Sequence, residues 1–401
     1  MTTSARFLVA FLVAGSALRG DVPEVLPAPL WEGPSRGEPG DPRLPVLLEV
    51  LEKAAPIALR GLEERLGISP GRARIRWKLE LGAPARNGEH RGGGAALEIE
   101  AGRTSFEGDD VIVALPGWKY LHRPRWAAPV ALHEATHAVM ASAAGSRRTY
   151  EGIPGWLREG IALWFSGEGP ARVREAIAWS VFQGGRPDAF LGNIDLSAPH
   201  GSSRVTAGMA AEAFLLVTWL ESELGLDGLR AVVREAVRGK PVVDLLETCL
   251  KAPPRGLRDR ALSHARTEVE RLIDRETEDL FARSLALRAR SDPEANRIWA
   301  ALLARDPRGP LAGTLLYLLG RTALEQDQRA PEGRAWLEAG LDLPDALWRP
   351  ESLVLLGECL LATGDRRGAE RLWRDVDRGW GEDAAPAARA RANLSRLGAA
   401  R

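Results

Sequence analysis

Apolar and polar positions follow two different periods along the first part of the chain. Apolar residues recur at helical spacing over residues 44–68, where Pro56 is expected to interrupt the helix. Residues 72–82 and 95–102 alternate between apolar and polar side chains, and the glycine-rich stretch between them predicts a long hairpin connection. Residues 110–116, DVIVALP, predict a short apolar strand. A helix and strands thus precede a helical remainder, which is typical of an α+β fold.

Two further helices are predicted over residues 129–145 and 153–167, because each stretch has a proline near its start, an apolar stripe and a terminal glycine. The first contains ALHEATHAVM, which places His133 and His137 on one helix face. Neutral imidazoles at this spacing can hold zinc at about 2.0 to 2.1 Å, and Glu134, rotated by about 100°, can reach a metal-bound water. The alternative is a pair of histidines that are hydrogen-bonded within a core.

The second helix carries Glu159 among apolar neighbours in IPGWLREGIALWFSG. An unpaired buried carboxylate is costly, so we expect a cation beside it. Glu159 follows His137 by 22 residues, which is enough for a turn and an antiparallel return to the first helix. Glu159 can therefore return to the neighbourhood of the two histidines.

These motifs resemble the gluzincin metallopeptidases, the thermolysin-like group with HExxH and a ligand glutamate about twenty residues later on a second helix. PGWLREGIA matches the second-helix pattern of the MA-like bacterial branch at Pro, Trp, Leu, Glu-Gly and Ala. The resemblance spans about residues 45–250 and includes a long and a short helix within 210–240. It implies a gluzincin-like domain over 45–274 with a small antiparallel or mixed sheet, and a peptide or protein substrate. It also implies one Zn²⁺ per chain, held by His133, His137 and Glu159. Residues 110–116 resemble the family's edge strand, on which an extended peptide would lie, although an interior strand is the alternative.

The chemistry that the resemblance implies is hydrolysis of a peptide bond. Zinc lowers the pKa of a water toward about 7, and Glu134 takes its proton during attack on a carbonyl and passes it to the leaving amine. The oxyanion needs a further donor. The tyrosine that the family often carries is absent from residues 208–211, so Tyr150 and His200 are the candidates, each explicable also as a surface residue. The carboxylate that the thermolysin pattern places four residues after the ligand glutamate is Leu163 here.

The last part of the chain predicts helical repeats. Residues 352–376 contain Gly357 and other small and large residues at the spacings that are typical of a tetratricopeptide repeat. Gly320 lies 37 residues before Gly357, at the equivalent position of a preceding repeat. We expect an all-α tetratricopeptide-like domain over 275–401. It would either bind a protein partner in a peptide groove or cap the peptidase domain, and both alternatives stay open.

The N-terminus predicts export. Residues 1–20 hold one arginine, an apolar run and small residues, as in a secretory signal peptide. The alternative is an uncleaved membrane anchor, against which the apolar run counts because it is shorter than the roughly 20 residues that span a bilayer. Residues 21–44 form a proline-rich leader that is expected to be extended. The expected location is periplasmic or extracellular.

Charge and cysteine content exclude other classes of protein. The 401 residues hold 54 basic and 54 acidic side chains, so no overall field recruits nucleic acid or an anionic membrane. Cys249 and Cys359 are interpreted as small buried residues outside any disulfide framework. Two further hypotheses are a catalytically silent zinc-binding protein and an adaptor that acts through its repeats.

Overall fold

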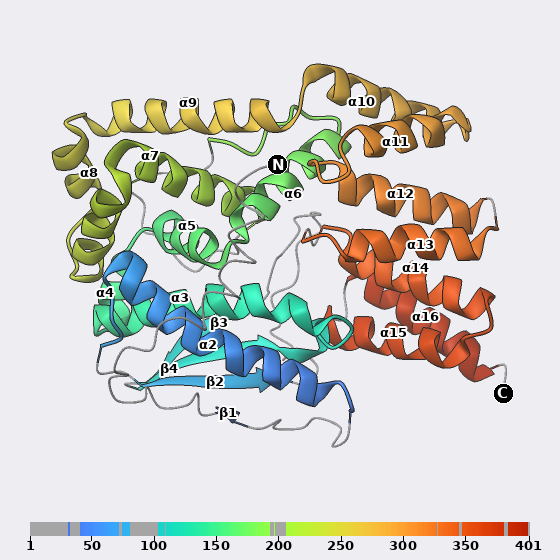
Figure 1. The fold of residues 1–401 in the computed structure, drawn as a ribbon, viewed down its shortest axis with the longest axis horizontal. Coiled ribbons are helices and arrows are strands. Elements are labelled where there is room, and N and C mark those ends of the chain that lie inside the picture. Colours follow the sequence, from blue (N-terminus) through green and yellow to red (C-terminus); the bar gives the residue numbers. More distant parts are fainter. Residues whose placement is uncertain are drawn as a thin grey trace, which may run out of the picture.

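A small sheet lies beside two helices, and further helices form the rest of the molecule (Figure 1). The computed structural model describes residues 31–32, 41–71, 74–80, 103–108, 110–192, 196, 206–326, 328–344, 347–380 and 384–399. The predicted signal segment, most of the leader and the predicted strand over 95–102 lie outside this part of the chain.

The sheet is mixed and has the strand order β1-β2-β4-β3. Its strands are β1 (Trp31–Glu32), β2 (Ile75–Glu80), β3 (Arg103–Glu107) and β4 (Asp110–Pro116). β2 pairs in parallel with β1 and β4, whereas β3 is antiparallel to β4. The prediction that residues 110–116 form an edge strand is wrong, because β4 is paired on both sides and buried up to its last residue. Among the described strands, β3 is the outer one next to β4.

Helix α2 (Leu44–Leu66) runs through Pro56 without a break, so the predicted interruption is also wrong. Proline inside a helix costs about 3 kcal/mol through a lost hydrogen bond and a steric clash. Leu47, Leu51 and Leu62 of this helix are completely buried, and α2 packs on α3 (Ala127–Ala144). Burial of several leucines at about 1.5 to 3 kcal/mol each outweighs the local cost of the proline.

The helices around the predicted metal site end where the sequence indicates. Gly145 and Gly167 cap their helices in the left-handed conformation, with φ of 69° and 77°. Two short 3₁₀ turns, η2 (Gly117–Lys119) and η3 (Pro124–Trp126), lead into α3, and α4 (Arg147–Gly152), α5 (Gly155–Ser166) and α6 (Gly169–Phe182) follow it. In α7 (Ala207–Val237), Gly225 has φ 66° and ψ 174° and divides the helix into a longer and a shorter part, as predicted.

Paired helices fill the C-terminal half, which confirms the predicted helical character. They are α8 (Val242–Leu250), α9 (Pro254–Leu272), α10 (Arg275–Ala289), α11 (Glu294–Arg305), α12 (Ala312–Glu325), α13 (Ala330–Leu341), α14 (Arg349–Ala362), α15 (Arg366–Gly379) and α16 (Ala385–Ala399). α10 packs on α11, α12 on α13 and α14 on α15. A Cβ atom on Gly320 would lie 2.7 Å from Leu337 Cγ, so this glycine permits the close approach of α12 to α13.

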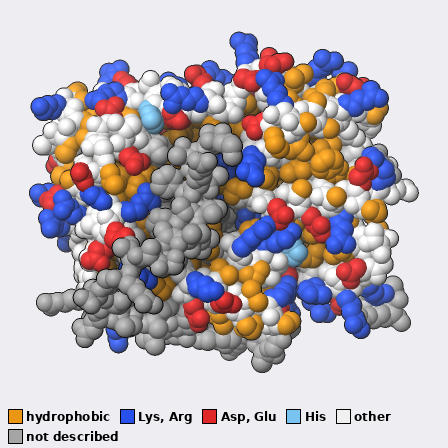
Figure 2. Space-filling view, in the orientation of Figure 1, with side chains coloured by type: hydrophobic (Ala, Val, Ile, Leu, Met, Phe, Trp, Pro, Cys, Tyr) orange, Lys and Arg blue, Asp and Glu red, His pale blue; other side chains and the backbone are white. Residues whose placement is uncertain are grey.

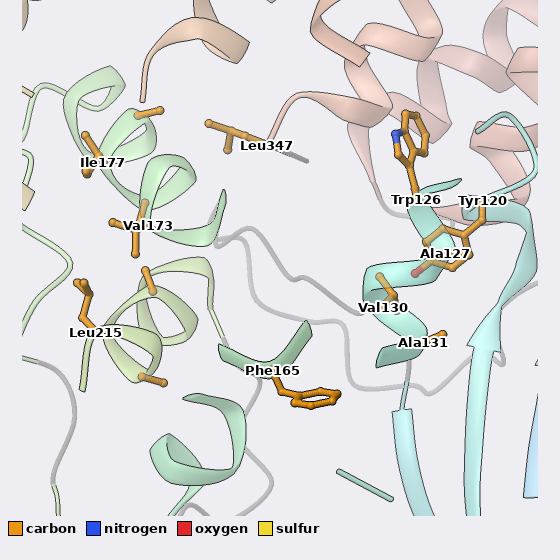
Figure 3. Packing of buried hydrophobic residues seen from close by; sticks show 14 of the residues in the cluster. Tyr120, Trp126, Ala127, Val130, Ala131, Phe165, Val173, Ile177, Leu215 and Leu347 are labelled. Carbon is orange, nitrogen blue, oxygen red and sulfur yellow. The ribbon is translucent and has the colours of Figure 1, made fainter. Parts of the chain in front are cut away.

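The C-terminal helices share a core with the first part of the chain. Figure 3 shows Leu347 in the same buried cluster as Val173, Ile177 and Trp126. The ring of Trp348 packs on Phe182 with ring centroids 5.0 Å apart. Contacts therefore cross the predicted boundary after residue 274, and the division into domains stays a prediction.

The surface supports one sequence interpretation and corrects another. Figure 2 shows basic and acidic side chains interspersed over one face, in line with their equal numbers. Within the described residues, no helix combines the length and apolar character of a membrane span. Cys359 is buried as expected, but Cys249, near the C-terminal end of α8, is exposed, so the prediction of a buried residue is wrong for Cys249. Both cysteines are free.

Candidate metal centre

Two packed helices carry the residues that the sequence singles out. Helix α3 presents His133, Glu134 and His137, and α5 presents Glu159. α5 also lies close to α7, because a Cβ atom on Gly160 would lie 2.6 Å from Val217 Cγ2. The glycine that follows the ligand candidate therefore sets the depth at which α5 packs.

The structure brings His133, His137 and Glu159 together, as predicted. The two Nε2 atoms of the histidines are 3.1 Å apart. Glu159 Oε1 lies 3.4 Å from His137 Nε2, and Oε2 lies 3.5 Å from His133 Nε2. One ligand atom from each residue falls within 4.8 Å of the others. This triad of side chains can hold a metal ion.

Burial and mutual attraction set the charges of the triad. Burial by itself raises the pKa of Glu159, but the two histidines outweigh it and hold that pKa well below the usual range. Burial lowers the pKa of His133, yet the hydrogen bond and charge of Glu159 outweigh it and raise the pKa to about 9. A metal ion that binds here must therefore displace a proton from His133, since only neutral imidazole is a ligand.

Glu134 is buried beside the triad, and its carboxylate is hydrogen-bonded to a residue of β3. The Thr104 hydroxyl on β3 donates a hydrogen bond to Glu134 Oε2 at 2.8 Å. Burial raises the pKa of Glu134, although the two histidines and Thr104 act in the opposite direction. Sequence analysis missed Thr104, because its place depends on how β3 pairs with β4 and not on any local motif.

The two predicted oxyanion donors have different outcomes. Tyr150 is buried, and its hydroxyl lies 3.1 Å from His137 Nδ1, the ring nitrogen that does not face the triad. The Arg158 guanidinium stacks over the tyrosine ring at 4.7 Å. The Tyr150 hydroxyl thus contacts the edge of the His137 imidazole that faces away from the triad, and this contact fixes the orientation of the imidazole. His200 lies outside the described residues.

A second carboxylate, which sequence analysis missed, lies behind the other histidine. Glu168 Oε2 is 3.5 Å from His133 Nδ1. Buried Arg172 donates to Glu168 Oε1 at 3.0 Å and to Glu175 Oε2 at 2.8 Å, so the position of Glu168 is fixed. Leu163, where the thermolysin pattern has such a carboxylate, is a core residue with 2% exposure. The signal available in the sequence was a Glu–Arg–Glu series at helical spacing beside a predicted buried helix.

The comparisons with known proteins give no family. No protein-family model, curated protein or solved structure matches this chain. The site is therefore defined by its own geometry, as a His–His–Glu triad in a mostly helical protein with a small mixed sheet.

Proposed function

We propose that this protein is a zinc-dependent peptidase of the gluzincin type. The observation that carries the proposal is the shape of the triad. A tetrahedral zinc ion at about 2.0 to 2.1 Å from its ligands requires ligand atoms about 3.3 Å apart. The two Nε2 atoms are 3.1 Å apart, Glu159 Oε1 lies 3.4 Å from His137 Nε2 and Glu159 Oε2 lies 3.5 Å from His133 Nε2. One ligand atom from each residue lies within 4.8 Å of the others, so His133, His137 and Glu159 would supply three ligands on one side of the metal ion.

When bound, Zn²⁺ supplies Lewis acidity that polarises a carbonyl and makes a water acidic near neutral pH. Glu134 is the proposed general base. Its Oε2 accepts the hydrogen bond of Thr104, which leaves Oε1 to accept the proton of the attacking water and to return it to the leaving amine. Its burial raises the pKa above that of an exposed glutamate and so makes the carboxylate a stronger base.

The position of β3 supports an extended peptide as the substrate. β3 is the outer described strand next to β4, and its Thr104 contacts the proposed base. A peptide that adds to this edge by main-chain hydrogen bonds would run past Glu134. We further propose export by the N-terminal segment, and a tetratricopeptide-like role for the C-terminal helices as a cap or partner-binding surface.

A second candidate function is zinc binding without hydrolysis. Tyr150 favours it, because its hydroxyl is engaged with His137 Nδ1 and so is held behind the imidazole. Such a protein would bind zinc with the same triad and would cleave nothing.

The experiment compares Glu159→Gln with Glu134→Gln, with Glu151→Gln as the control on the exposed surface. Zinc content by mass spectrometry and cleavage of a peptide library are measured for each purified variant. Glu159→Gln should lose zinc and cleavage together. Glu134→Gln should retain zinc and lose cleavage by about 10²- to 10⁴-fold. Zinc in the wild type without any cleavage would favour the second candidate, and no zinc in the wild type would refute both.

A further inference from the structure

A cleft of about 330 Å³ lies between α15 and residues near the start of α2, and it shares no residue with the metal centre. Its volume is at the lower end of the about 300 to 1,000 Å³ typical of small-molecule sites. The lining consists of five arginines, three carboxylates, a proline and a tryptophan, namely Arg43, Arg367, Arg371, Arg374, Arg378, Asp41, Glu370, Asp375, Pro42 and Trp118. We call it the arginine cleft. Its lining has a net charge of +2, since five arginines face three carboxylates.

Helix α15 supplies four of these arginines from one face. Arg367, Arg371, Arg374 and Arg378 are spaced by four, three and four residues, so their side chains lie in a row. The opposite side of α15 is buried through Leu372, Trp373 and Val376. Like charges at this spacing repel each other, so a row of four needs negative charge nearby.

The carboxylates of the cleft are already bound by some of its arginines. Arg43 binds Asp41 at 2.7 Å and Asp375 at 2.5 Å. Arg374 binds Glu370 at 2.6 Å.

Two other arginines of the cleft have no such partner. Neither Arg367 nor Arg371 makes a hydrogen bond or ion pair with any described residue. Two guanidinium groups, one helical turn apart, therefore line the cleft without a close ion pair to a described residue, although the charge of Arg371 acts to lower the pKa of Asp41 and Asp375.

The pKa of a neighbouring histidine, His122, reflects the positive electrostatic potential of this region. Burial, together with the charges of Arg123, Arg43 and Arg371, lowers the pKa of His122 to about 4. Two of those three arginines line the cleft. An anion in the cleft would offset this potential.

We propose that the arginine cleft binds a small phosphate monoester. A phosphate monoester carries about −1.5 to −2 charge at neutral pH, which matches the +2 of the lining. The planar guanidinium fork binds phosphate oxygens in pairs, and two forks one turn apart can hold one phosphoryl group between them. The remaining volume accommodates the organic part of the ester. The ligand joins α15 to the N-terminal end of α2.

The test measures binding of glycerol 3-phosphate by isothermal titration calorimetry, with the full-length protein. Arg367→Gln/Arg371→Gln should weaken binding by at least about tenfold, because two charge-assisted contacts are lost. The matched control is Arg283→Gln/Arg308→Gln, which changes two exposed arginines outside the cleft and should bind as the wild type does. Circular dichroism and melting temperature establish that both double variants are folded.

Three outcomes would overturn the proposal. They are no binding of glycerol 3-phosphate by the wild type, equal loss of binding in both double variants, and binding of succinate as tight as that of the phosphate ester.

A second experiment, with lipid vesicles, distinguishes the source of the phosphoryl group. Flotation with phosphatidic acid vesicles that is lost in Arg367→Gln/Arg371→Gln, without binding of glycerol 3-phosphate, would replace the small ligand by a lipid headgroup and overturn the proposal as stated.

Discussion

Glu168→Gln tests how the metal centre is built, because it removes a charge behind His133 and leaves the three proposed ligands in place. Glu168 Oε2 lies 3.5 Å from His133 Nδ1, and its other oxygen accepts from Arg172 at 3.0 Å. A glutamine has nearly the same shape and still offers an oxygen to Arg172. The variant therefore loses the anionic partner of the imidazole, which in a bound state makes the histidine a stronger ligand.

The expected magnitude follows from the geometry. Substitutions behind a ligand histidine typically cost about 10- to 100-fold in metal affinity. The 3.5 Å separation is longer than a charge-assisted hydrogen bond, so we expect the lower end. About tenfold corresponds to about 1.4 kcal/mol. The metal-free protein should also lose about 1 to 3 kcal/mol of unfolding free energy, less than for breaking a whole buried ion pair, because Arg172 keeps Glu175.

The assay is competition for zinc with a calibrated chelator, combined with urea unfolding of the metal-free protein. Glu151→Gln is the matched control, since Glu151 and Arg147 form an exposed ion pair at the same four-residue spacing. It should change neither quantity by more than about 0.5 kcal/mol. Unchanged zinc affinity in Glu168→Gln, together with a loss of stability, would refute the role behind His133 and leave Glu168 as a partner of Arg172 alone.

Two further predictions concern the surroundings of the site, and a third concerns a buried carboxylate of α14. Gly160→Ala should lower unfolding free energy by about 1 to 3 kcal/mol and reduce zinc content, because the new methyl group meets Val217 and the Ala213 carbonyl; thermal unfolding and zinc analysis check this. Tyr150→Phe should stay folded yet bind zinc up to about tenfold more weakly in chelator competition, since the hydroxyl no longer orients the imidazole. Burial raises the pKa of Glu351 from 4.5 to about 7, so unfolding free energy should fall as pH rises between these values, and Glu351→Gln should remove up to about 3 kcal/mol of that fall in urea unfolding at pH 4.5 and pH 8.

Local sequence signals were sufficient for the elements that carry the triad. The four-residue spacing of His133 and His137 depends only on helix geometry, and glycines mark the ends of both helices. Glu159 could be singled out as a residue that needs a cation, because a carboxylate among apolar residues requires a compensating charge. Each of these inferences needs a few neighbouring residues and no knowledge of the wider fold.

Strand order and helix continuity could not be obtained in this way. An all-apolar strand such as 110–116 indicates burial, but it does not say which strands lie beside it. Pro56 carries a real local cost, and only the packing of α2 on α3 decides that the helix continues. Glu168 was missed for the same reason. It follows the turn at Gly167, and its approach to His133 depends on how α6 and α3 lie in space.

The charges behind the metal centre continue into the C-terminal helices. Arg349 at the start of α14 stacks over Trp126 at 4.0 Å, immediately before α3. Burial lowers the pKa of Arg349 to about 10, while Glu175 and, more weakly, Glu168 raise it through their charges and Arg172 lowers it. Glu168, whose carboxylate faces His133, thus interacts electrostatically with Arg172 of α6 and with Arg349 of α14. Because opposite charges at low exposure interact over several ångströms, the position of α14 affects the electrostatics of the triad. The C-terminal helices therefore contribute to the electrostatic environment of the candidate metal centre.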